Sequence, residues 1–192
     1  MTFSETELDQ YRQQGFVLVP GAVDRAALDA YDVRFNEIVS GDVAKPENMR
    51  VMRDVMVVRG AVNPPTPVHG VNKLLNFEDD PVLSGYPKDP AILDRVHALV
   101  GAQVYSIATN VFNKPPGIDG RHPLHQDLLY FRIRPAEGIV GTWTAISPCT
   151  RENGCLAIIP GSHLGELRKH ADPDWEYVNR GFVGIAEEVG SN

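Results

Sequence analysis

The stretch RHPLHQDLLYF at residues 121–131 contains a histidine, His125, and an acid, Asp127, that stand two positions apart. In an extended segment, side chains at positions i and i+2 point to the same face. One imidazole and one carboxylate on one face are two of the three ligands in the 2-His-1-carboxylate triad that holds non-haem Fe(II). The pair alone is a weak signal, because His and Asp fall two apart by chance in many proteins. A surface strand with a local His–Asp hydrogen bond is the alternative.

The sequence around this stretch divides into a helical half and a β-rich half. Apolar residues recur at helical spacing over residues 5–13, 24–39 and 89–100, with Ser4 and Asp24 as caps and a proline opening the third segment. The segments GFVLVPG (15–21) and 51–58 are strand-like. After Gly101, the runs QVYSIATNVF, IVGTWTAISP and CLAIIPG are rich in β-branched and aromatic residues and are separated by turn residues. We therefore expect an α+β domain whose sheet is built mostly from residues after 100, as a sandwich or barrel.

Composition limits the class of protein. The chain has 192 residues, of which 43% are hydrophobic and 22% are charged, as in a globular domain. The formal net charge of −7 disfavours a general nucleic-acid binder. No apolar run approaches the roughly 20 residues that span a bilayer, and the N-terminus lacks the pattern of a leader peptide. We expect a cytoplasmic protein with no membrane association and with both cysteines reduced.

Several motifs in one order resemble the phytanoyl-CoA dioxygenase family. They are NKPPGIDGRHPLHQDLLYF at 113–131, ENGCL at 152–156 and PGSH at 160–163, flanked by QQGFVLVPG, VMRD and ADPDWEYVNRGFVGI elsewhere in the chain. The resemblance implies a double-stranded β-helix (jelly-roll) core with supporting N-terminal helices. It also implies Fe(II), 2-oxoglutarate as co-substrate and O2, and hydroxylation of an unactivated carbon of a small-molecule substrate such as a branched acyl-CoA.

The resemblance assigns roles to individual residues. His125 and Asp127 match the metal-binding and catalytic pair. Lys73, Asn110 and Trp143 fall where the family lines the 2-oxoglutarate pocket, although a solvated lysine, a surface asparagine and a core tryptophan are the alternatives. Gln126 would face away from the iron, either as a structural polar residue or as a contact to the co-substrate region.

The remaining histidines have structural interpretations. His122 lies three positions before His125 and would face the other way on a strand, so we expect a structural role. His163 follows a tight Pro-Gly turn, where a packing role or support for a ligand is favoured over metal ligation. His170 lies in a charged loop.

The family pattern also contains a distal histidine and an arginine that binds 2-oxoglutarate, and nothing after His163 resembles that strand. We therefore expect residues 1–192 to form a single incomplete domain. Residues 1–100 would be mostly helical support, residues 101–192 would begin the jelly-roll core, and the C-terminal strands would be missing. A truncated or degenerate, non-catalytic jelly-roll binding module is the alternative, and a zinc hydrolase that uses HxxHxD is a third possibility.

Overall fold

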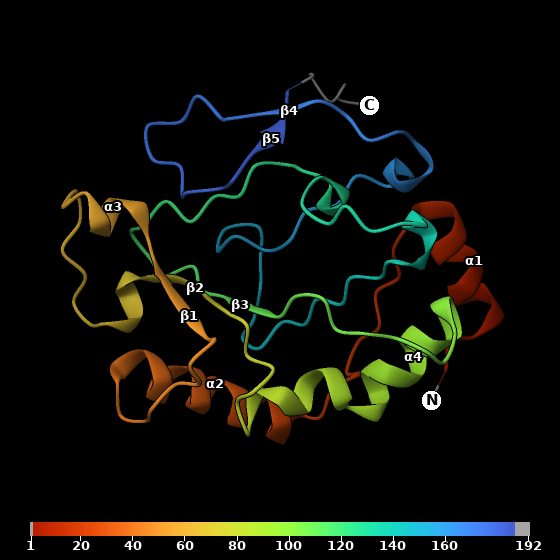
Figure 1. Ribbon diagram of the computed structural model, residues 1–192, viewed down its shortest axis with the longest axis horizontal. Coiled ribbons are helices and arrows are strands. Elements are labelled where there is room, and N and C mark those ends of the chain that lie inside the picture. The colour runs from red at the N-terminus through yellow and green to blue at the C-terminus, as the bar shows by residue number, and fades with distance from the viewer. Residues whose placement is uncertain (1, 187–192) are drawn as a thin grey trace.

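The computed structural model describes residues 2–186, and the expected domain of residues 1–192 extends at both ends outside the described residues. The chain contains four α-helices and five short strands in this part. The helices are α1 (Glu5–Gln14), α2 (Arg25–Ser40), α3 (Val55–Val58) and α4 (Pro90–Val100). The strands are β1 (Arg50–Arg53), β2 (Val71–Leu75), β3 (Asn110–Phe112), β4 (His170–Ala171) and β5 (Gly184–Ile185). Figure 1 shows α2 and α4 on one side of β1, β2 and β3, with β4 and β5 on the other.

The three long helices confirm the sequence prediction. They could be predicted because the residues that start each helix lie close together in the sequence. Ser4 and Glu7 form a capping box at the start of α1, in which each side chain bonds the other residue's backbone N–H. The Asp24 carboxylate accepts from the Ala26 N–H at 2.7 Å at the start of α2. Asp89 does the same for Ala91 at 2.8 Å in front of α4. Each helix is therefore started by a side chain within three residues of the N–H group that it binds.

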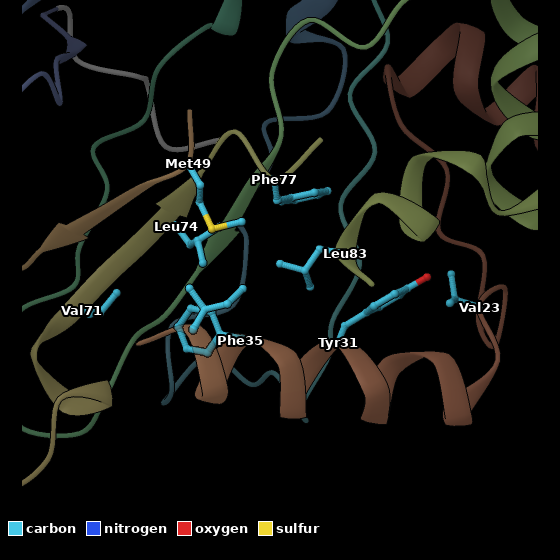
Figure 2. Packing of buried hydrophobic residues seen from close by; sticks show 9 residues of the cluster. Val23, Tyr31, Phe35, Met49, Val71, Leu74, Phe77 and Leu83 are labelled. Carbon is cyan, nitrogen blue, oxygen red and sulfur yellow. The ribbon is translucent and has the colours of Figure 1, made fainter. Parts of the chain in front are cut away.

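The first sheet joins strands from both halves of the sequence. Its order is β1-β2-β3, and both pairs are antiparallel. Leu74 pairs with Val51 on one side and with Val111 on the other, so these three side chains share one face. That face packs on α2, and Leu74 is fully buried there. Figure 2 shows Phe35 of α2 below Leu74, and Tyr31 of the same helix with its hydroxyl directed toward Val23.

Several predicted strands are wrong. The segment 15–21 forms no strand, and the segment 51–58 is a strand only at its start, because the Asp54 carboxylate accepts from the Met56 N–H at 2.9 Å and begins α3. Of the three runs expected after Gly101, only residues 110–112 pair in a sheet. The three-stranded sheet takes β1 and β2 from before residue 100, so its expected origin is also wrong. A β-branched run becomes a strand only when another segment lies beside it, and the described residues supply few such partners.

The fold class is mixed helix and sheet, as expected for an α+β domain. The described residues form one three-stranded and one two-stranded antiparallel sheet, and they do not show the double-stranded β-helix. Within these same residues, no helix combines the length and apolar character needed to cross a bilayer.

Candidate functional site

The His125 and Asp127 side chains converge. The His125 Nε2 atom lies 3.2 Å from an Asp127 carboxylate oxygen. His125 lies outside any helix or strand, and Asp127 begins a short 3-10 turn over Asp127–Leu129, so the pair does not lie within a regular strand. Gln126, between them, nevertheless has an extended backbone, and the two flanking side chains meet on the same side, as their spacing predicts.

The second ring nitrogen of His125 is held by the backbone. Nδ1 lies 2.9 Å from the carbonyl oxygen of Pro123, and a carbonyl accepts only, so Nδ1 carries the hydrogen. Nε2 therefore offers either a lone pair or, in the imidazolium form, a second N–H directed at Asp127. The hydrogen bond to this carboxylate raises the pKa of His125 above its ordinary value, against the opposing effect of burial.

This arrangement fits a divalent cation. A backbone carbonyl that fixes the tautomer through Nδ1 and orients Nε2 is the usual support for a metal-bound histidine. A cation between Nε2 and the carboxylate would take the place of the proton that joins the pair in the imidazolium form. In the described part of the chain, no third His, Cys, Asp or Glu joins these two to form a three-ligand cluster.

Lys73 and Asn110 lie on one face of the first sheet. Lys73 pairs with Phe112 across β2 and β3, and Leu75 pairs with Asn110, so the four side chains project on the same side, away from the face that packs on α2. The Lys73 side chain is half-buried. Burial lowers the pKa of Lys73, and the negative charge of Asp127 partly opposes this effect. Lys73 thus stands in the field of the candidate metal site.

His122 packs between two aromatic rings. Its ring centroid lies 5.0 Å from that of Phe112 and 4.0 Å from that of Phe182. Burial lowers the pKa of His122 to about 4, which keeps the imidazole neutral at physiological pH. The ring thus fills apolar space on the flank of Lys73, in agreement with a structural role.

Gln126 faces away from the His125–Asp127 pair and binds backbone. Its amide nitrogen donates to the Glu166 carbonyl at 3.2 Å, and its amide oxygen accepts from the Arg168 N–H at 2.7 Å. Its own backbone N–H donates to His170 Nε2 at 3.0 Å. The residue therefore fastens segment 166–170 behind the candidate metal site.

The two histidines downstream are engaged elsewhere. His170 Nδ1 lies 2.8 Å from the Arg168 carbonyl, so both of its ring nitrogens have partners. His163 Nε2 lies 3.0 Å from the Arg12 carbonyl, and the ring covers Gly15 just after α1. Neither histidine joins His125 and Asp127 in this arrangement.

Trp143 is 48% exposed. The hydroxyls of its neighbours Thr142 and Thr144 both contact the Tyr86 hydroxyl, at 3.2 and 2.8 Å. No ring contact or hydrogen bond joins Trp143 to Lys73 or His125 among the described residues.

Sequence reasoning missed Phe112, Phe182 and Tyr130. Phe112 and Phe182 flank Lys73, and the Tyr130 ring packs edge-on against the His125 ring, with centroids 5.6 Å apart. Tyr130 belongs to the 121–131 stretch, and its closeness in sequence to His125 is the one signal that could have indicated a place at the site. A cavity of about 710 Å³ also adjoins this stretch, lined by His122, Leu124 and Trp175 among others, but neither His125 nor Asp127 lines it.

One protein family and several known proteins are similar to this chain in sequence. The family described as Phytanoyl-CoA dioxygenase (PhyH) matches residues 11–189. A probable phytanoyl-CoA dioxygenase of Caenorhabditis elegans is 38% identical over 92% of the chain and 58% of its own length. The peroxisomal phytanoyl-CoA dioxygenases of Bos taurus and Homo sapiens are 38% and 37% identical, over 95% and 92% of the chain. The matches cover 54% and 53% of those two proteins, so the chain spans little more than half the length of these relatives. By its sequence, the chain is a member of the phytanoyl-CoA dioxygenase family.

Proposed function

We propose that this chain forms part of an Fe(II)- and 2-oxoglutarate-dependent dioxygenase. The enzyme would hydroxylate an unactivated carbon of an acyl-CoA in fatty acid metabolism. The observation that carries the proposal is the convergence of His125 Nε2 and Asp127 at 3.2 Å, with Nδ1 fixed by Pro123. The names of the relatives supply the acyl-CoA substrate class. The comparisons do not favour the alternative of a non-catalytic binding module.

The chain's own residues would bind and orient the reactants. His125 and Asp127 would hold Fe(II), which together with 2-oxoglutarate and O2 supplies the oxidising chemistry. Lys73 would attract a carboxylate of 2-oxoglutarate, because its half-buried ammonium lies on the same side as the metal pair. Asn110 and Trp143 would line the rest of this pocket. Gln126 would contribute indirectly, by fastening segment 166–170 behind the ligands.

A complete catalytic unit would require more than these residues. We propose that a third iron ligand and an arginine for 2-oxoglutarate lie on strands that close a jelly-roll core, as the family resemblance implies. Two protein ligands hold a metal less tightly than three. The 192-residue chain alone should therefore bind iron weakly and turn over little 2-oxoglutarate. The cytoplasmic location expected from the sequence also stays a proposal, and the mammalian relatives are named peroxisomal.

The test joins the chain to the part of the Caenorhabditis elegans relative that follows the matched segment. Release of CO2 from labelled 2-oxoglutarate is measured with Fe(II) and phytanoyl-CoA. We expect iron-dependent release by the joined protein and loss of it in His125→Ala and Asp127→Ala. His163→Ala is the matched control, because His163 binds the Arg12 carbonyl and has no contact with the pair among the described residues. Release that persists in both site variants would overturn the proposal.

A further inference from the structure

Segment 179–185, here called the strap, is tied at both ends to distant parts of the chain. At its start, the Asn179 amide donates to the Asp54 carboxylate at 3.0 Å and accepts from the Val55 N–H at 2.8 Å. At its end, the Ile185 N–H donates to the Leu124 carbonyl at 2.7 Å. The strap therefore runs from the start of α3 to the stretch that carries His125.

The Tyr130 hydroxyl holds the middle of the strap. It donates to the Gly181 carbonyl and accepts from the Val183 N–H, both at 3.2 Å. A phenol has one donor and can accept as well, so both bonds can form together. These two hydrogen bonds are here called the clamp. Because the Tyr130 ring also packs on the His125 ring, the clamp links the strap directly to the candidate metal site.

Phe182, between the two clamped residues, points inward and is only 7% exposed. Its ring lies 5.0 Å from Lys73 Nζ, and Phe112 lies 5.2 Å from the same atom on β3. The Lys73 ammonium is thus flanked by two apolar rings. Such walls exclude water, and a charge interacts more strongly with an opposite charge where water is excluded.

We propose that Phe182 is a wall of the subsite in which Lys73 receives a carboxylate, and that Tyr130 is the positioning residue that holds this wall in place. The choice of 2-oxoglutarate as the source of the carboxylate rests on the proposed function. The wall itself rests on the contacts of Phe182 and Tyr130 alone. Phe182 lies 55 positions after Asp127 and is not among the residues assigned to the pocket from the sequence.

The test is the rate at which acetic anhydride labels each lysine, followed by mass spectrometry across pH. The rate reached at high pH reports access to the deprotonated amine, and the other four lysines serve as internal references. In Phe182→Ala, we expect the high-pH rate at Lys73 to rise several-fold, with little change at the references. Tyr130→Phe should give a smaller rise, and Phe182→Trp should restore shielding. Tyr105→Phe, which changes an almost fully exposed tyrosine, should have no effect.

An unchanged rate at Lys73 in both Phe182→Ala and Tyr130→Phe would overturn the wall. If Phe182→Ala unfolds the protein, all five lysines label faster. The labelling rate of Lys73 in Tyr130→Phe, which removes one oxygen atom, then decides whether the wall exists. Addition of 2-oxoglutarate separates this inference from the proposed function. Protection of Lys73 in the wild type, reduced in Phe182→Ala, supports the carboxylate subsite. Absence of protection in a wild type whose Lys73 is shielded would overturn the ligand assignment.

Discussion

Residues 2–100 and residues 101–186 differ in how they are stabilised. The first region contains all four α-helices and the buried cluster that runs from Val23 to Leu83. In the second region, Phe182 is the one residue of the described hydrophobic core, while Leu156 and Ile158 are about half exposed. Apart from Val111 and Ile146, which pack on this cluster, the second region is held by hydrogen bonds, such as that of Asn179 to Asp54 in the first region and that of Gln126 to Glu166 within the second. Packing organises the first region, and specific polar contacts place the second on it.

The largest expected effect comes from the core of the first region. Leu74→Ala should lower the free energy of unfolding by about 3–4 kcal/mol, because it leaves a cavity under a fully buried side chain. The matched change in the second region, Leu156→Ala, removes the same atoms from a side chain that is 51% exposed. It should cost less than about 1 kcal/mol. Urea unfolding measures both. Equal losses would show that the second region has a core of its own.

The tie between the two regions should be next in size. Asp54 and Asn179 are almost fully buried, at 1% and 3% exposed, and replacing Asp54 leaves the Asn179 amide N–H and the Met56 N–H without their acceptor. Asp54→Ala should therefore cost about 3 kcal/mol, from an unpaired buried amide and a lost helix cap together. Asp24→Ala removes only a helix cap that an exposed carboxylate provides, and it should cost about 1 kcal/mol. If Asp54→Ala costs no more than this control in urea unfolding, the tie contributes nothing.

A smaller, pH-dependent effect should come from His122. Its folded-state pKa is about 4, whereas the unfolded chain has the ordinary value of 6.5, so the unfolded state binds more protons between these values. Stability should therefore fall as the pH drops from 6.5 to 4, by about 2 kcal/mol after allowance for partial exposure. His122→Phe should remove this part of the pH dependence and keep the contacts with Phe112 and Phe182. Equal slopes for wild type and variant between these pH values would contradict the assigned burial.

The same difference explains what could be predicted from the sequence. Helix ends depend on residues a few positions apart, such as Ser4 with Glu7, so α1, α2 and α4 were predicted nearly to the residue. The His125–Asp127 pair is equally local. The contacts around Lys73 are not local in sequence. Phe182 lies beside Lys73 only because its segment is hydrogen-bonded to Asp54, Leu124 and Tyr130. The strand β2 was also missed, since its pairing with β1 and β3 depends on segments more than 15 positions away.

The measurement that tests the central claim most directly is a titration of the protein with Mn(II), a paramagnetic substitute for Fe(II), followed by NMR of the histidine rings. The method detects weak binding, as expected for two protein ligands. We predict that the His125 ring signals broaden at lower Mn(II) concentration than those of His163 and His170, whose nitrogens bind backbone groups. Asp127→Asn should weaken this selective broadening, and Asp172→Asn, which changes an acid outside the pair, should leave it unchanged. Earlier broadening of His163 or His170, or broadening of His125 that survives in Asp127→Asn, would contradict the account.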